Sequence, residues 1–192
     1  FDIWMRLLQK TPGSILWLFE SNHWVIENIR REAHLRGVDA TRLFFAPKKP
    51  PAQHLARYRL ADLVLDTFPY TSHTTGSDAL WAGAPLLTYA GETFASRVAG
   101  SLLVNVGLPE LITYSLEEYE ALALELAHDP ERLAALRQRL QANLPTAPLF
   151  DSPRFTRSME AAFELMWQRF QAGLAPDHID VHLDDRGNAP PP

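Results

Sequence analysis

Apolar and polar positions follow one another along this chain in two kinds of block. Short continuous apolar runs, such as 14–20 and 42–46, have the length of strands that are covered on both faces. Between them, apolar residues recur three or four positions apart, which is typical of helices packed on a sheet. The first such helix is predicted over 2–10, and Pro12 with Gly13 ends it.

The same pattern continues to about residue 172. Further strands are expected at 63–66, 85–89 and 111–113. Further helices are expected at 22–36, 53–60, 75–83, 93–106, 116–127, 130–142 and 154–172, with Ser21 and Ser115 as candidate N-caps. Strands that alternate with helices in this way predict an α/β fold: a parallel sheet with right-handed crossovers and helices on both faces.

Composition narrows the class of protein. The chain has 192 residues, of which 46% are apolar, and a net charge of -5, which argues against a dedicated binder of nucleic acid or of anionic membranes. It has no cysteine, so a disulfide framework and a thiolate metal site are excluded, and a cytosolic location fits. No apolar run is long enough to span a bilayer. The chain begins without Met and inside an amphipathic pattern, so we expect it to be a piece of a longer protein.

Three loops leave the carboxyl ends of predicted strands, at 20–23, 46–54 and 67–75. In a parallel sheet these loops lie at one edge, where ligands of such folds bind. We therefore expect them to face one crevice. The chain has no Gly-x-Gly-x-x-Gly motif, which argues against a nicotinamide or flavin dinucleotide as its ligand.

The predicted central helix opens on small and hydroxyl-bearing residues. The start of a helix leaves several backbone N–H groups unpaired and carries the positive end of the helix dipole, so it attracts anions. Thr74, Thr75 and Gly76 would let a phosphate approach this end closely. His73 could add a further donor, and Asp78 could face a sugar hydroxyl.

Structural roles stay open for the same residues. Thr75 and Asp78 have the spacing of a capping box, in which Thr75 would be the N-cap of the helix. Asp66, at a strand end, is either a general base or a structural acceptor for the amides of the loop. His54, taken alone, would be a solvated surface residue, and Arg57 an ion-pair partner or a cover for the sheet edge.

Several short motifs follow one another in a fixed order. They are Phe45-Ala-Pro47, Leu60-Ala-Asp62, Leu65-Asp-Thr67, His73-Thr-Thr-Gly76, Leu80-Trp-Ala-Gly83, Gly91-Glu92 and Ala95-Ser-Arg-Val-Ala99. In kind and in order these motifs resemble the carboxyl-terminal half of the catalytic region of the O-GlcNAc transferase family, including its bacterial members. The residues at 148–150 and 176–178 fit the same family, so the resemblance covers nearly the whole chain.

The resemblance implies a GT-B glycosyltransferase built from two facing Rossmann-like domains. Such an enzyme moves N-acetylglucosamine from UDP-GlcNAc to Ser or Thr of proteins, with inversion and without a metal or other cofactor. Residues 1–175 would be the second, UDP-sugar-binding domain, with helix 154–172 as a candidate to dock on the first domain. Residues 176–192 would form a mobile Pro-rich tail.

The family's other parts are expected upstream of this chain. They are a region of helical TPR repeats and the first Rossmann-like domain, which carries the catalytic histidines. The catalytic residues are therefore unknown from this chain, which we expect to be inactive alone. Its expected partners are the UDP-sugar, a protein or peptide acceptor and the missing amino-terminal half, with no nucleic acid and no membrane.

The resemblance also assigns roles around the nucleotide. His54 falls where the family stacks an imidazole on uracil, and Lys49 where a backbone group contacts the edge of the base. Arg57 matches a basic neighbour of the base, and Asp78 the carboxylate that holds the ribose hydroxyls. A family lysine that helps to bind ribose falls on Pro51 here.

Other assignments concern the diphosphate and the sugar. His73, Thr74 and Thr75 match the donors around the diphosphate, and Tyr70 falls near the N-acetyl pocket. Whether Lys48 or Lys49 replaces the lysine that the family has in this loop is open. Two alternative functions stay open as well: half of another UDP-sugar enzyme such as a nucleotide-sugar epimerase, and a non-catalytic Rossmann-like domain that binds proteins.

Overall fold

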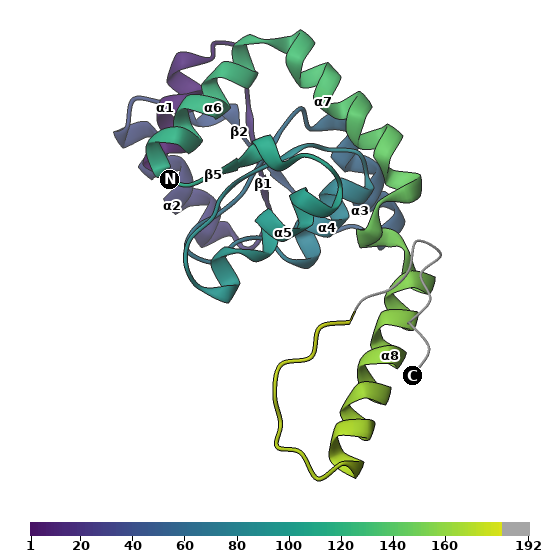
Figure 1. Cartoon of the computed structure of the whole chain (residues 1–192). Helices are drawn as coiled ribbons and strands as arrows, with labels where there is room; N and C mark the ends of the chain where they lie inside the picture. The colour runs from purple at the N-terminus through teal and green to yellow at the C-terminus, as the bar shows by residue number, and fades with distance from the viewer. Residues whose placement is uncertain (182–192) are drawn as a thin grey trace. The chain divides into compact units, whose positions relative to one another are not determined.

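The computed structural model describes residues 1–181 (Figure 1). Within it the chain forms two compact units, one over residues 1–142 and one from Asn143 onward. The expected division into a domain over 1–175 and a tail stays a prediction, and most of that tail, 182–192, lies outside the described residues.

The first unit alternates strands with helices, as the pattern of apolar residues predicts. Its strands are β1 (Leu16–Phe19), β2 (Leu43–Ala46), β3 (Val64–Leu65), β4 (Leu86–Tyr89) and β5 (Ile112–Thr113). Its helices are α1 (Asp2–Lys10), α2 (His23–Leu35), α3 (Pro51–Arg57), α4 (Thr74–Trp81), α5 (Val98–Asn105), α6 (Leu116–His128) and α7 (Pro130–Asn143). Asn22, not Ser21, caps α2 by accepting the N–H of Val25, while Ser115 caps α6 as expected.

All strand pairs are parallel, but the hydrogen-bonded ladder is divided into two groups. β1 pairs with β2, and β4 lies between β3 and β5. The parallel pairing predicted from the sequence is confirmed, but the pattern does not predict this division. β3 has only two residues, and a cavity of about 850 Å³ is lined by residues of both β1 and β3, so these two strands stay apart.

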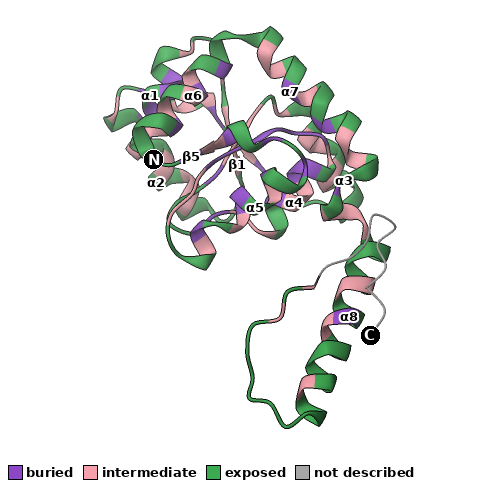
Figure 2. Cartoon of the chain, in the orientation of Figure 1, coloured by how far each residue is buried: buried purple, intermediate pink, exposed green. Residues whose placement is uncertain are grey.

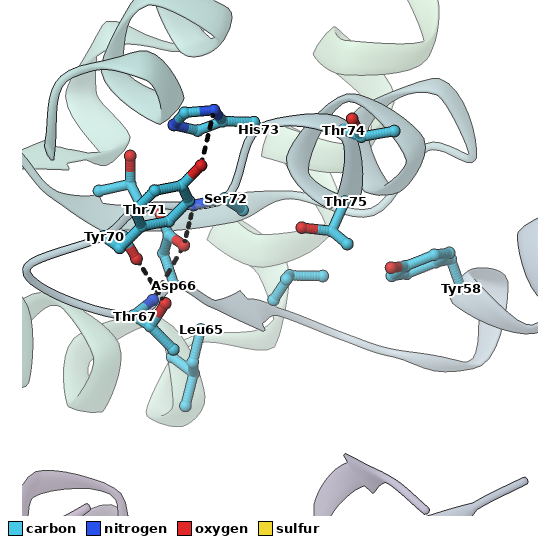
Figure 3. Close-up of a pocket in the computed structure, with 11 residues that line it drawn as sticks. Tyr58, Leu65, Asp66, Thr67, Tyr70, Thr71, Ser72, His73, Thr74 and Thr75 are labelled. Atoms are coloured by element: carbon cyan, nitrogen blue, oxygen red, sulfur yellow. Dashed lines mark hydrogen bonds between the residues drawn. The ribbon is translucent and has the colours of Figure 1, made fainter. Parts of the chain in front are cut away.

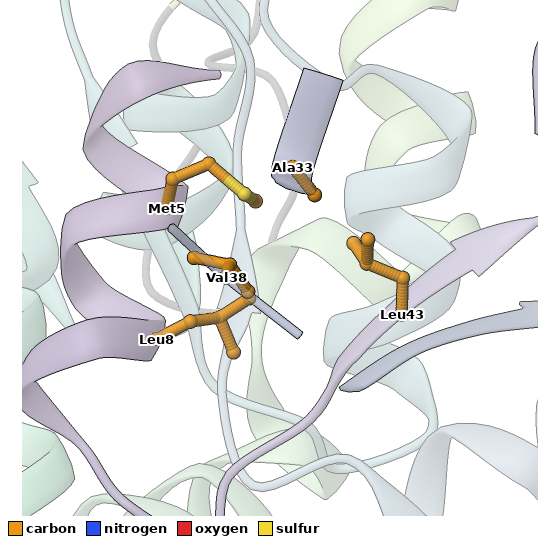
Figure 4. Packing of buried hydrophobic residues seen from close by; sticks show 5 residues of the cluster. All are labelled: Met5, Leu8, Ala33, Val38 and Leu43. Atoms are coloured by element: carbon orange, nitrogen blue, oxygen red, sulfur yellow. The ribbon is translucent and has the colours of Figure 1, made fainter. Parts of the chain in front are cut away.

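Helix α1 packs on both groups of strands. Met5 and Leu8 are buried in a cluster with Leu43 of β2, drawn with its neighbours in Figure 4. One position away, Leu7 belongs to a second cluster with Leu87 of β4. Ile3 and Trp4 are partly buried against these clusters, and the other positions of this amphipathic helix are exposed (Figure 2). Burial of these apolar side chains, at about 25 cal/mol per Å², holds the two groups of strands together.

Strand β4 is covered on both faces. On one face, Leu86 lies beside Leu102 of α5 where α4 approaches the sheet at Gly76. On the other face, Leu87 packs with Tyr119 of α6. Both leucines are fully buried, which explains why this strand is a continuous apolar run rather than an alternating one.

The second unit is dominated by α8 (Ser152–Gln171). Asp151 caps this helix by accepting the N–H of Arg154 at 2.9 Å. Ala161 is its one buried residue among those described, and its large apolar side chains are exposed: Phe155, Met159, Phe163, Leu165, Met166, Trp167 and Phe170. Among the described residues, no helix has both the length and the apolar character needed to cross a membrane.

A pair of charged residues joins α1 to α6. Arg6 donates through Nε to both carboxylate oxygens of Glu120, at 2.9 and 3.0 Å. Lys10 Nζ lies 3.5 Å from Oε1 of the same carboxylate. The hydrogen bonds from Arg6 hold the pKa of Glu120 below its ordinary value of 4.5. The ion pair therefore favours the folded state whenever Glu120 is ionised.

We expect Gly76→Ala to destabilise the chain by about 1–2 kcal/mol, although alanine is the better helix former. A Cβ at this position would lie 2.6 Å from Ser72 Oγ, 3.2 Å from Leu102 and 3.3 Å from Leu86. Urea denaturation of the variant measures the loss. Ser77→Ala, on the same turn, is the control and should stay within about 0.5 kcal/mol of wild type. A Gly76→Ala chain as stable as wild type would contradict this packing.

We expect Glu120→Gln to lower the melting temperature at pH 7 and to have little effect at pH 3. The pKa of Glu120 is lower in the folded than in the unfolded chain, so its contribution is present above pH 4.5 and is lost as pH falls through the folded pKa. Thermal unfolding at both pH values tests this. Glu27→Gln, on an exposed position of α2, is the control. An equal loss at both pH values would show that the ionised carboxylate is not the cause.

Candidate functional site

A cavity of about 370 Å³ lies at the carboxyl end of β3, where the chain leaves the sheet and turns into α4 (Figure 3). Its volume is within the range of small-molecule sites. Leu65 and Asp66 contribute from the strand end, and Thr74 and Thr75 from the first turn of α4. The loop at 67–73 supplies most of the remaining wall. The cavity therefore lies at the edge of the sheet that the sequence predicts for a ligand.

Helix α4 begins without a side-chain cap. Its N-cap is His73, whose side chain accepts no hydrogen bond from the helix, and Thr75 lies inside the first turn. The capping box proposed for Thr75 and Asp78 is therefore wrong, because the helix begins earlier than that box requires. The first N–H groups of α4 adjoin the cavity without a side-chain acceptor, which is the arrangement found at anion sites.

The ring of His73 lies among aromatic side chains at the mouth of this cavity. Tyr70 stacks on it at 4.7 Å between ring centroids, with its hydroxyl 3.5 Å from Nδ1 (Figure 3). Phe94 meets the same ring edge-on at 6.0 Å. His73 Nε2 and the nearby Ser72 Oγ are buried without a hydrogen-bond partner. Unpaired buried polar atoms of this kind cost about 1–3 kcal/mol each, which a ligand with suitable polar atoms would offset.

Asp66 holds the loop rather than facing solvent. Its Oδ1 accepts the backbone N–H groups of Thr67 at 2.9 Å and Ser72 at 2.8 Å. Its Oδ2 accepts the hydroxyl of Thr88 at 2.7 Å. Of the two roles left open for this carboxylate, the structure gives it that of a structural acceptor for loop amides.

His54 and Arg57 lie together on α3. Arg57 Nη2 is 2.6 Å from His54 Nδ1, and Arg57 Nη1 donates to the carbonyl of Pro47 at 2.7 Å. The guanidinium also lies 5.9 Å from the ring centroid of Trp17, a cation–π distance. Because the guanidinium N–H groups can only donate, His54 Nδ1 is the acceptor in this contact, which leaves Nε2 as the nitrogen that carries the ring N–H.

The residues of α3 and those of α4 line two cavities that share part of their walls. His54 and Arg57 line the larger cavity of about 850 Å³, whereas Tyr58 and Thr75 line both cavities. Burial raises the pKa of the Tyr58 phenol, and the negative charge of Asp78 raises it further. Asp78 is thus close to Tyr58, which lies in the shared wall.

The structure brings most of the predicted site residues together. Four of them line the smaller cavity: Tyr70, His73, Thr74 and Thr75. Thr75 also lines the larger cavity, together with His54 and Arg57. Gly76 is buried below the first turn of α4. Asp78, though near Tyr58, is not among the residues that line the two cavities. Lys49 is not among them either, and it is exposed in the loop before α3.

Two residues of this region were missed from the sequence. Tyr58 is four positions after His54, and this helical spacing could have placed the two side chains on one face. Phe94 is distant in sequence and no local pattern relates it to His73. Among the described residues, no group of three or more His, Asp or Glu side chains lies close enough to hold a metal ion.

Comparison with known proteins gives consistent matches. The chain is 38% identical over 178 residues to a UDP-N-acetylglucosamine–peptide N-acetylglucosaminyltransferase of Caenorhabditis elegans, covering 93% of this chain and 16% of the relative. It is 38% identical over 185 residues to the probable transferase SEC of Arabidopsis thaliana, covering 96% of this chain and 19% of the relative. The chain thus spans about a fifth or less of these relatives.

A solved structure shares the fold. A mutant O-GlcNAc transferase of Thermobaculum terrenum superposes with a TM-score of 0.83 at 35% sequence identity, covering 90% of this chain and 34% of that one. The expected fold class, a Rossmann-like parallel α/β fold of the GT-B type, is confirmed by this match. The model of a sequence family described as Glycosyl transferase family 41 matches residues 1–159. The chain therefore belongs to glycosyltransferase family 41.

Proposed function

We propose that this chain is the donor-binding half of an inverting, metal-independent glycosyltransferase. The complete enzyme would move N-acetylglucosamine from UDP-GlcNAc to Ser or Thr of proteins, in the cytoplasm. The observation that carries the proposal is the uncapped first turn of α4, where His73, Thr74 and Thr75 adjoin a cavity at the carboxyl end of β3. The relatives named above are peptide N-acetylglucosaminyltransferases, which supports transfer over the epimerase alternative.

The start of α4 suits the diphosphate of such a donor. As the glycosidic bond breaks, the leaving UDP gains negative charge, which fixed N–H groups, hydroxyls and a helix dipole can stabilise without a metal. Thr74 and Thr75 add hydroxyl donors beside the N–H groups. A fixed donor of this kind is typically worth about 3 kcal/mol of barrier.

Residues from α3 suit the nucleoside. His54 is held by Arg57 and lines a cavity that adjoins the start of α4, so its ring is available to stack on uracil. Base stacking on an aromatic ring contributes about 1–3 kcal/mol. Asp78 would accept hydrogen bonds from the ribose hydroxyls, and the backbone at Lys49 would contact the edge of the base. Tyr70 would border the N-acetyl group.

Other parts of the reaction belong to chain outside these residues. The catalytic groups would come from an amino-terminal half of the same enzyme, preceded by TPR repeats, and the acceptor would be a protein or peptide. The chain alone would then bind the donor without transferring the sugar. A non-catalytic Rossmann-like domain that binds proteins would instead bind no UDP.

We expect His54→Ala and Asp78→Ala each to weaken UDP binding by about 5- to 100-fold, since each would remove one contact worth about 1–3 kcal/mol. Titration of the chain with UDP, followed by chemical shifts, measures the affinity, and thermal unfolding should change little. His34→Ala, on an exposed position of α2, is the matched control. Loss of fold in Asp78→Ala would favour a structural role for that residue.

We expect the full-length protein to transfer labelled N-acetylglucosamine from UDP-GlcNAc to a Ser-containing peptide in the presence of a chelator. Thr75→Val would lower the rate by about 10- to 100-fold, because it removes one hydroxyl donor near the leaving group. The control is Ser77→Val, because Ser77 lies two residues after Thr75 on the same helix and does not line the cavity. Release of an epimerised sugar, with no labelled peptide, would contradict the proposed reaction.

A further inference from the structure

Asp66 has no contact with the substrate in the function proposed above, yet its carboxylate is among the most constrained groups of the first unit. The residue is 7% exposed. Each carboxylate oxygen is occupied: Oδ1 by the N–H groups of Thr67 and Ser72, and Oδ2 by the hydroxyl of Thr88. Hydrogen bonds to an ionised acceptor are stronger than those between neutral groups.

The backbone of Asp66 is fixed as well. Its N–H donates to the carbonyl of Leu87 at 3.0 Å, in continuation of the ladder between β3 and β4. Its carbonyl accepts the hydroxyl of Tyr119 on α6 at 3.0 Å. Burial raises the pKa of that phenol, and the charge of Asp66 adds to the rise, so Tyr119 remains a donor. The carboxylate therefore projects from a point that the sheet and α6 hold in place.

The two amides that Asp66 binds stand at opposite ends of one loop. Thr67 is the first residue after Asp66, and Ser72 is the last before His73, the N-cap of α4. A single oxygen atom thus closes the loop and sets the place where the helix begins. Thr71 supplies a second tie, because both its hydroxyl and its N–H donate to the carbonyl of Ala95, at 2.7 and 3.0 Å.

We propose that Asp66 is a positioning residue for the diphosphate: it holds the loop 67–72 so that the first N–H groups of α4 face the cavity before the donor arrives. This inference rests on the function proposed above. Donors that are placed in advance need no reorganisation when charge develops, and misplacement by about 1 Å can cost about 100-fold in rate. The three donors to Asp66 also take up its negative charge, which would otherwise repel a phosphate nearby.

Variants of the full-length protein separate positioning from stability. We expect Asp66→Ala to weaken UDP binding at least about 10-fold at a temperature where the protein is folded, by isothermal titration. Asp66→Asn should stay within about threefold of wild type, because its amide oxygen still accepts both N–H groups while Thr88 turns to accept from the amide nitrogen. Thr88→Val leaves the loop amides bonded and should also stay within about threefold.

Thr113→Val is the matched control for stability. Its hydroxyl is buried in the same part of the sheet and donates to the carbonyl of Thr88 at 2.9 Å, without contact to the loop. The variant should melt at a lower temperature and bind UDP as wild type does. If folded Asp66→Ala binds UDP as tightly as wild type does, the positioning role is wrong, but the proposed function still stands. If the wild-type protein binds no UDP, the proposed function is wrong, and this inference fails with it.

Hydrogen exchange on the wild-type protein gives a second test that needs no variant. If Asp66 organises the loop in advance, the amides of Thr67 and Ser72 are protected in the free protein, by about 100-fold or more over an unfolded chain. Mass spectrometry of the fragment that contains 66–73 measures this. Unprotected amides in the absence of UDP would overturn the inference even if Asp66→Ala fails to fold.

Discussion

A helix that begins without a side-chain cap leaves its first N–H groups unpaired, and α4 begins in this way at the edge of a buried sheet. Such a helix start is stable only if other interactions fix it. Here Gly76 lets the first turn approach Leu86 and Leu102, and Asp66 and Thr71 tie the preceding loop to its surroundings. The first N–H groups of α4 therefore stay available to an anion. The free energy lost by leaving them unpaired is offset by these packing contacts and hydrogen bonds.

The polar groups behind this helix start are continuous across three strands. Thr113 donates to the backbone of Thr88, and the Thr88 side chain donates to Asp66. Each of these buried groups has a partner, so the network specifies one arrangement of the strand ends instead of destabilising the sheet. Nearby, Arg57 connects His54 to the Pro47 loop. The two halves of the candidate nucleotide site are thus each supported by residues that need not contact the ligand.

The alternation of apolar runs and helices was sufficient to predict the parallel α/β fold and the edge at which the site lies. Recognition of the motifs, more than spacing, selected His54, whereas His73 also follows from its place at the helix start. The sequence leaves two roles open for Asp66, and its hydrogen bonds to the loop amides select the structural one. The capping box of Thr75 was wrong, and the separation of β1 from β3 was not predicted, because the helix start and this separation depend on tertiary packing. The contact between Phe94 and His73 joins distant segments and leaves no local signal.

The support for α4 reaches it from the sheet side, whereas the side chains in the middle of the preceding loop are partly open to solvent. Phe68 is 45% exposed and Tyr70 62% exposed, and the anchoring hydrogen bonds begin at the two ends of the loop. Tyr70 stacks on His73, the N-cap of α4, and Phe68 stacks on Tyr89 of β4. A substitution at position 70 would therefore alter the ring that faces His73 while leaving in place the hydrogen bonds from Asp66 that fix the loop. The shape of the candidate site beside α4 can in this way change independently of the support for the helix.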